Sequence, residues 1–116
     1  MIHYSQRGET NMETKKINYT LCPKFEKAFS ILGKKWNGLI IDVLLEEHGQ
    51  RFVELSKTIP MLSDRVLAER LKELEEEQIV KKEEHLYILT DKGVALQESF
   101  ASVKRWSEEW CDAKEA

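Results

Sequence analysis

Cys22 and Cys111 are the residues of this 116-residue chain whose side chains could react covalently. Cys22 directly precedes Pro23, which suits the first turn of a helix, and Lys24 and Lys27 follow closely. Because a helix N-terminus and nearby positive charge stabilise a thiolate, this setting favours a lowered thiol pKa and reaction with oxidants or electrophiles. The alternative is that each free cysteine is only a small apolar packing residue.

Metal binding and catalysis have little support in the sequence. The cysteines and the three histidines, His3, His48 and His85, lack the paired spacing of zinc ligands. The chain has no glycine-rich phosphate loop, no nucleophile elbow, no metalloprotease helix and no Cys-x-x-Cys pair of a thiol oxidoreductase. We therefore expect no metal, no cofactor and no enzymatic activity.

The stretch from Ser63 to Glu76 has the pattern of a capped amphipathic helix. Ser63 is placed to accept a hydrogen bond from the first free backbone amides, and leucines recur at steps of four and three residues. These apolar positions are Leu67, Leu71 and Leu74. With them in the core, the helical period of about 100° per residue turns a polar face outward, with Arg70 toward its flank. That face carries Arg65, Ala68, Glu69 and Lys72.

The outward side chains are of types that recognise base pairs in the DNA major groove. Arg65 can form a bidentate pair with guanine, Glu69 can accept from cytosine N4, and Ala68 can touch a thymine methyl group. Glu69 could instead pair with Arg65 on the helix surface. Further side chains are expected to hold phosphates, which sets register without reading sequence. These phosphate ligands are Ser63, Arg70, Lys72, Lys81 and Lys82.

The elements around this helix follow the order of a winged helix-turn-helix, an α+β fold that is mainly α. A shorter helix is predicted over Phe52 to Ile59, ending before a proline because proline disfavours helical conformation in the preceding residue. Two antiparallel strands, Ile79 to Lys82 and Leu86 to Leu89, flank a polar link of three residues and would form a short wing. Thr90 then caps a final helix that continues almost to the chain end.

Apolar stripes predict helices outside this unit and a surface for a partner. A first helix runs from Pro23 to Gly33, and a second, covered on several sides, runs from Trp36 to Glu47. The final helix carries an apolar stripe that needs a partner surface. We expect a second copy of the chain to supply it, and packing on its own domain is the alternative. The expected dimer contacts are Phe25, Phe29, Phe100, Val103, Trp106 and Trp110.

Length and composition are those of one domain. Residues 1–21 are polar and are expected to be a flexible N-terminal arm, with Met12 as an alternative translation start, and residues 22–116 form the domain. Charged residues make up 34% of the chain, and no apolar run reaches the about 18 residues of a membrane span. The sequence shows no secretory signal, so we expect a cytoplasmic protein.

The formal net charge of −3 does not by itself suggest a nucleic-acid partner. Local distribution matters more, and we expect basic side chains to share one face while Glu73, Glu75 and Glu76 lie elsewhere. The alternative is that these charges only solvate helix surfaces. The basic set is Lys34, Lys35, Arg65, Arg70, Lys72, Lys81 and Lys82.

Several sequence blocks, taken in order from Cys22 to about Trp110, resemble the HxlR-type transcriptional regulators of the MarR-like superfamily. The blocks are Cys22-Pro23, Gly33-Lys34-Lys35-Trp36, Arg51-Phe52-Val53-Glu54-Leu55, Ile59-Pro60, Ser63, Val66 to Glu75, and Leu89-Thr90-Asp91-Lys92-Gly93. The resemblance implies a homodimer whose terminal helices form the interface and whose Ser63 helix binds operator DNA. The wing is shorter than is usual in the family, so its two lysines are expected to reach flanking phosphates rather than the minor groove.

The resemblance also implies a role for the cysteines. In members that sense quinones, electrophiles or oxidants, the cysteine at the position of Cys22 is the sensor. A cysteine in the last helix, here Cys111, can form a disulfide with it between subunits. These observations lead to a dimeric, sequence-specific DNA-binding transcriptional regulator, expected to be a repressor that responds to small electrophiles or oxidants. The competing hypothesis is a dimeric winged-helix module that binds proteins and not DNA.

Overall fold

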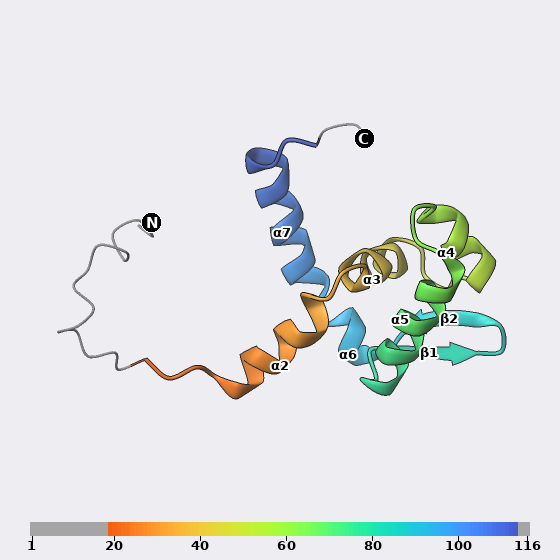
Figure 1. Cartoon of the computed structure of the whole chain (residues 1–116), viewed down its shortest axis with the longest axis horizontal. Helices are drawn as coiled ribbons and strands as arrows, with labels where there is room; N and C mark the ends of the chain where they lie inside the picture. Colours follow the sequence, from red (N-terminus) through yellow and green to blue (C-terminus); the bar gives the residue numbers. More distant parts are fainter. Residues whose placement is uncertain (1–18, 114–116) are drawn as a thin grey trace.

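The computed structural model describes residues 19–113, which form helices and a two-stranded antiparallel sheet (Figure 1). The elements, in chain order, are α2 (Pro23–Leu32), α3 (Asn37–Glu46), α4 (Phe52–Thr58), α5 (Asp64–Glu76), β1 (Val80–Glu83), β2 (Leu86–Leu89), α6 (Asp91–Val94) and α7 (Gln97–Trp110). Helices α4 and α5 form the helix-turn-helix, and the β1–β2 hairpin is the wing. The predicted mainly α winged helix-turn-helix is confirmed, whereas most of the predicted N-terminal arm lies outside the described residues.

Helices α3, α4 and α5 and the hairpin share one apolar core. In α3, Ile40, Ile41 and Leu44 are at most 1% exposed, as expected for a helix covered on several sides. Leu55 of α4 and the three leucines of α5 are equally buried. Because both helices of the helix-turn-helix contribute to this core with α3, their orientation is set by apolar packing.

The hairpin differs slightly from the predicted one. Glu83 pairs with Leu86, so β1 extends one residue beyond the predicted strand, and only Glu84 and His85 remain in the turn. Glu84 adopts a left-handed backbone with φ of 58°, which two-residue hairpin turns favour because it matches the twist of the strands. The wing is therefore a short, tight hairpin.

The prediction of one continuous final helix is wrong, because the segment forms two helices, α6 and α7. The hydroxyl of Thr90 accepts a hydrogen bond from the Gly93 amide at 3.2 Å, which confirms the predicted cap. The Leu96 amide then donates to the Gly93 carbonyl at 3.0 Å, a tighter turn than an α-helix makes. This turn ends α6 beside β2 and redirects the chain into α7 (Figure 1).

The terminal helices α2 and α7 extend away from the core, and neither contains a buried residue. Figure 1 shows them leaving the neighbourhood of α3 in different directions. Trp36, at the N-cap of α3, has a left-handed backbone with φ of 82°. This conformation is costly for a bulky residue, and it makes the chain turn sharply between α2 and α3.

Replacement of Gly93 by alanine tests how closely α6 is held to the hairpin. A Cβ atom at this position would lie 2.5 Å from the Ile79 carbonyl oxygen and 2.9 Å from Leu89 Cδ2. We expect Gly93→Ala to lower the free energy of unfolding by about 1–3 kcal/mol, measured by urea unfolding at fixed protein concentration. The control is Val94→Ala at the exposed next position, expected to change stability by less than about 0.5 kcal/mol. Equal stability of the two variants would contradict this packing.

Candidate DNA interface and thiol positions

The start of α5 is fixed by hydrogen bonds of Ser63 and Asp64. Ser63 Oγ accepts from the Val66 amide at 3.2 Å, which confirms the predicted cap. Asp64 accepts a hydrogen bond from Ser56 Oγ of α4 at 2.7 Å, and its charge lies at the positive end of the helix dipole. These contacts tie the beginning of α5 to α4 and hold the two helices of the motif at a set angle.

The outward face of α5 has the composition predicted for it. Arg65, Ala68, Glu69 and Lys72 are all exposed, opposite the three buried leucines. Neither Arg65 nor Glu69 forms an ion pair with another residue of 19–113, so the local pairing considered for them is absent from this part of the chain. The helix therefore presents a continuous polar face with its side-chain ends directed away from the core.

Arg70 has contacts that its predicted role as a phosphate ligand did not include. Its Nε donates a hydrogen bond to the Lys35 carbonyl at 3.1 Å, and its Nη1 lies 3.9 Å from Glu73 Oε1. Only 18% of the side chain is exposed. The guanidinium therefore contacts the connection between α2 and α3. No sequence pattern marks this partner, because it is a backbone carbonyl 35 residues away.

The expected separation of basic and acidic side chains is wrong at the α2–α5 contact. Glu73 pairs with Lys34, and Glu77 pairs with Lys27 at 3.1 Å, so acidic residues of the α5 segment lie directly beside basic residues of the α2 segment. The reason is that the C-terminal half of α5 packs near α2 and requires opposite charges there. Lys34 is therefore paired with Glu73 within the chain and does not form a basic surface together with Arg65.

The wing presents mixed charge. Lys81 lies 3.3 Å from Glu83, its neighbour on the same face of β1. Lys82 points to the opposite face, where its Nζ lies 5.2 Å from the centre of the Tyr87 ring. Because successive residues of a strand face opposite sides, the two lysines are not placed to hold one phosphate together. Exposed Glu83 and Glu84 make the tip of the hairpin acidic.

The two cysteines lie at the outer ends of the terminal helices, one at a helix N-terminus and the other at a helix C-terminus. Cys22 is the N-cap of α2, and Cys111 is the C-cap of α7. Both are exposed free thiols. Figure 1 shows that the outer ends of these helices point apart, so the fold of one chain does not bring the two sulfur atoms together.

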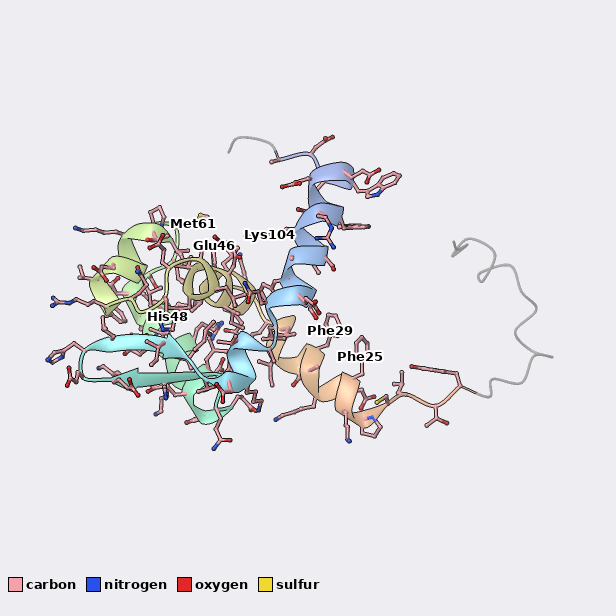
Figure 2. The ribbon with its side chains drawn as sticks, turned by 180° about the vertical axis from the view of Figure 1, so that it is seen from behind. Phe25, Phe29, Glu46, His48, Met61 and Lys104 are labelled. Atoms are coloured by element: carbon pink, nitrogen blue, oxygen red, sulfur yellow. The ribbon has the colours of Figure 1, made fainter. Side chains whose placement is uncertain are left out.

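An apolar groove of about 790 Å³ lies between α2, α3 and α7. Phe25 and Phe29 line it from α2 with their rings in edge-to-face contact, 4.9 Å between centroids, and Figure 2 shows both in the angle between α2 and α7. Phe100 is half-buried against the core, whereas Val103 lies exposed at the α7 wall. Four of the residues predicted for the dimer interface therefore line this groove, two from α2 and two from α7. The other two, Trp106 and Trp110, lie further along α7.

The described part of the chain gives no sign of a metal site or a membrane span. Within residues 19–113, histidine, cysteine, aspartate and glutamate side chains do not gather into a group that could hold a metal ion. Each helix in that range is too short or too polar to cross a bilayer.

Comparison with known proteins identifies the family. The model of the HxlR-like helix-turn-helix family matches residues 31–115. YodB, an HTH-type transcriptional regulator of Bacillus subtilis (strain 168), is 49% identical over 100 residues, which cover 80% of this chain and 88% of YodB. The crystal structure of quinone-bound YodB from B. subtilis is 53% identical with a TM-score of 0.72, covering 77% of this chain and 100% of that one. The redox regulator HypR in its reduced form is 29% identical with a TM-score of 0.68, covering 74% of this chain and 91% of that one. This chain therefore belongs to the HxlR-like helix-turn-helix family, and the relatives that it matches are transcriptional regulators.

Proposed function

We propose that this chain is a homodimeric transcriptional repressor that binds operator DNA through α5 and releases it when Cys22 is modified by an oxidant or electrophile. The main support for the proposal is the exposed polar face of α5. The opposite face of the same helix is buried in the core. A helix held in this way can enter the major groove while it keeps every contact to its own domain.

The proposed DNA contacts divide into base contacts and phosphate contacts. Arg65 lies in the first turn of α5, where recognition helices approach base edges, and its guanidinium matches the acceptors of guanine. Ala68 and Glu69 follow on the same face and suit a thymine methyl group and cytosine N4. Arg70 is left out because its Nε is already bonded to the Lys35 carbonyl. The proposed phosphate ligands are Ser63, Lys72, Lys81 and Lys82.

A second copy of the chain is the proposed partner of the aromatic surface on α2 and α7. Five of the six predicted interface residues are between 56% and 69% exposed in the single chain. Monomeric proteins rarely leave such a patch in water, and aromatic residues are enriched in interface cores. The five are Phe25, Phe29, Val103, Trp106 and Trp110. Phe100 is half-buried already and has less surface to give to a partner.

The sensing proposal is supported by the exposure of both thiols and by the relatives, since YodB has been crystallised with a quinone and HypR is a redox regulator. The Cys22 thiolate would attack a quinone ring carbon. A sulfur–carbon bond forms as the ring C=C π bond breaks and its electrons move onto a carbonyl oxygen, which takes up a proton. The hydrogen on the attacked carbon then moves as a proton to the other carbonyl oxygen, which gives a hydroquinone thioether. With diamide, Cys22 and Cys111 of the second copy would lose two electrons and two protons to form a disulfide, and the azo bond would become a hydrazine.

A dimeric winged-helix module that binds proteins and not DNA is the second candidate. Its support is the net charge of −3 and the acidic hairpin tip at Glu83 and Glu84. Both features oppose the approach of DNA phosphates, which supply most non-specific affinity.

Selection from a library of randomised DNA duplexes separates the two candidates. The repressor proposal requires recovery of duplexes with two related half-sites about one helical turn apart. It also requires that the affinity for these duplexes, measured by fluorescence anisotropy, falls as salt is raised. A library that stays random after repeated selection would favour the protein-binding module instead.

Arg65→Ala tests the base contact at the start of α5. We expect binding to the selected duplex to weaken by about 1–3 kcal/mol and the preference at one position of each half-site to relax. Arg70→Ala is the contrast, because it should lower stability to urea while base preference stays the same. Repeating the library selection with each variant gives the preferences. An Arg65→Ala protein with every base preference intact would exclude this contact.

Trp106→Glu tests the aromatic surface. Burying a carboxylate in an interface core is strongly unfavourable, so the variant should sediment as a monomer at concentrations where the wild-type chain sediments as a dimer. The matched control is Val53→Glu on α4, which replaces another apolar residue that is 53% exposed but lies outside the aromatic surface. A dimer that survives Trp106→Glu and dissociates in Val53→Glu would place the interface elsewhere.

Cys22→Ser tests sensing without removing the fold. The reduced variant should bind the selected duplex as the wild type does, because Cys22 is exposed and makes no cap hydrogen bond. It should then remain bound when benzoquinone or diamide is added. Cys111→Ser should keep the quinone response and lose the diamide-induced dimer on a non-reducing gel. Normal release by Cys22→Ser would show that another group senses the compound.

A further inference from the structure

Lys104 joins α7 to the core by ion pairs. Its Nζ lies 2.8 Å from Asp42 Oδ1 and 3.2 Å from Glu46 Oε2, both on α3. Figure 2 shows the Lys104 side chain on the side of α7 that faces Glu46. Within residues 19–113, α7 makes no other ion pair with another element. Lys104 is therefore the polar attachment of a helix that has no buried residue.

The apolar attachment of α7 lies one turn earlier. Phe100 is half-buried against the core, as is Leu96 just before the helix. Phe100 and Lys104 are four residues apart, so they share a face of α7 and lie about 6 Å apart along its axis. A helix held only at one end can pivot about that contact. A second contact further along the same face fixes its direction.

The charges of α3 explain why a cation belongs at this position. Asp42 and Glu46 are four residues apart on one helix, where like charges repel each other. Hydrogen bonds to Asp42 and then to Glu46 raise the pKa of Lys104, as expected for an ammonium that faces two carboxylates. Exposed ion pairs of this kind contribute little to folding stability. A small contribution is enough to bias the direction of a helix with few other contacts.

We propose that Lys104 is a positioning residue for DNA binding, whose ion pairs with Asp42 and Glu46 fix the direction of α7 on α3 and thereby set the half-site spacing that the dimer accepts. The inference rests on the proposed function, because it needs α7 in the dimer interface and α5 on the DNA. The core that holds α5 would then be attached to the interface partly through α3. In the dimer, any change in the angle between α7 and α3 of a subunit would move the two α5 helices relative to each other.

DNA is a sensitive measure of that angle. One base pair added between half-sites moves the second half-site by about 3.4 Å and rotates it by about 34° about the duplex axis. A dimer with α7 fixed tolerates such a change poorly, whereas a dimer with α7 free to pivot can follow it. Spacing preference therefore reports the stiffness of the α7–α3 contact, and affinity for one half-site does not.

The experiment uses duplexes carrying the two half-sites selected by the wild-type protein, with the spacer unchanged or altered by one base pair. We expect the wild type to prefer its own spacing by about tenfold or more and Lys104→Glu to prefer it by about threefold or less. The affinity of Lys104→Glu for a duplex with a single half-site should equal that of the wild type. Lys104→Met, which keeps the apolar stem, should show the same loss and replaces Lys104→Glu if that variant does not dimerise.

Rescue variants and a charge control sharpen the result. Lys104→Arg and the charge swap Lys104→Glu with Asp42→Lys should restore the preference, because each places opposite charges across the α7–α3 contact. The matched control is Arg105→Glu, with the same change of charge on the next residue. Its parent side chain donates a hydrogen bond to Ser102 of α7 itself at 3.1 Å and forms no ion pair within residues 19–113, so the variant should keep the preference.

The outcomes separate this inference from the proposed function. A wild-type selection without paired half-sites would overturn both. Paired half-sites with an unchanged preference in Lys104→Glu and Lys104→Met would overturn the role of Lys104 and leave the repressor proposal intact. Equal loss of preference in Arg105→Glu would also overturn it, because the effect would then follow the charge of α7 and not the contact with α3.

Discussion

Burial of the leucine face of α5 is the interaction on which the arrangement of the molecule depends. Leu67, Leu71 and Leu74 are at most 1% exposed, and burial of each contributes about 1.5–3 kcal/mol relative to exposure. Their spacing fixes the rotation of α5 about its own axis, because a turn of one residue would bring a charged side chain into the core. The polar face that includes Arg65 is exposed as a consequence. The cap at Ser63 then fixes where along the chain that face begins.

Polar contacts connect two helices of the core, α5 and α3, to the terminal helices. On one side, Arg70 of α5 donates to the Lys35 carbonyl, at the connection between α2 and α3. On the other side, Lys104 of α7 pairs with the acidic residues of α3. Each terminal helix thus has a polar attachment to the core and an apolar surface left open. Under the proposed function, a second copy of the chain covers those surfaces.

Periodicity and capping rules were sufficient for the elements whose own residues determine them. The buried leucines, the Ser63 and Thr90 caps and the hairpin all follow from local patterns and appear in the structure. The break between α6 and α7 was not predicted, because no residue pattern marks the turn at Leu96, and α6 is joined to the hairpin by tertiary contacts such as the hydrogen bond from the Thr90 amide to the Ile79 carbonyl. The partner of Arg70 was equally inaccessible, since a backbone carbonyl carries no sequence signature.

The site at Lys104 did have a signal that sequence reasoning passed over. Asp42 and Glu46 are charged residues four apart in an otherwise apolar helix, and such a pair requires either water or a cation from another element. The cation could not be identified without the fold, because α7 carries both Lys104 and Arg105 and only the turn at Leu96 decides which of them faces α3. The phase of α7 relative to the core is set by that turn and by Phe100, not by its own periodicity.

Under the proposed function, the same attachments explain how a change at an exposed thiol could reach DNA. Cys22 lies at the outer end of α2, a helix of 10 residues, about 15 Å long, that carries displacement along its axis without bending. The other end of α2 meets Trp36, whose left-handed backbone is strained, and the Lys35 carbonyl held by Arg70. Modification of Cys22 can shift the DNA-binding equilibrium only by the difference in its interactions between the two dimer arrangements. The connection between α2 and α3, which is bonded to Arg70 of α5, is therefore a route by which a displacement of α2 would reach α5.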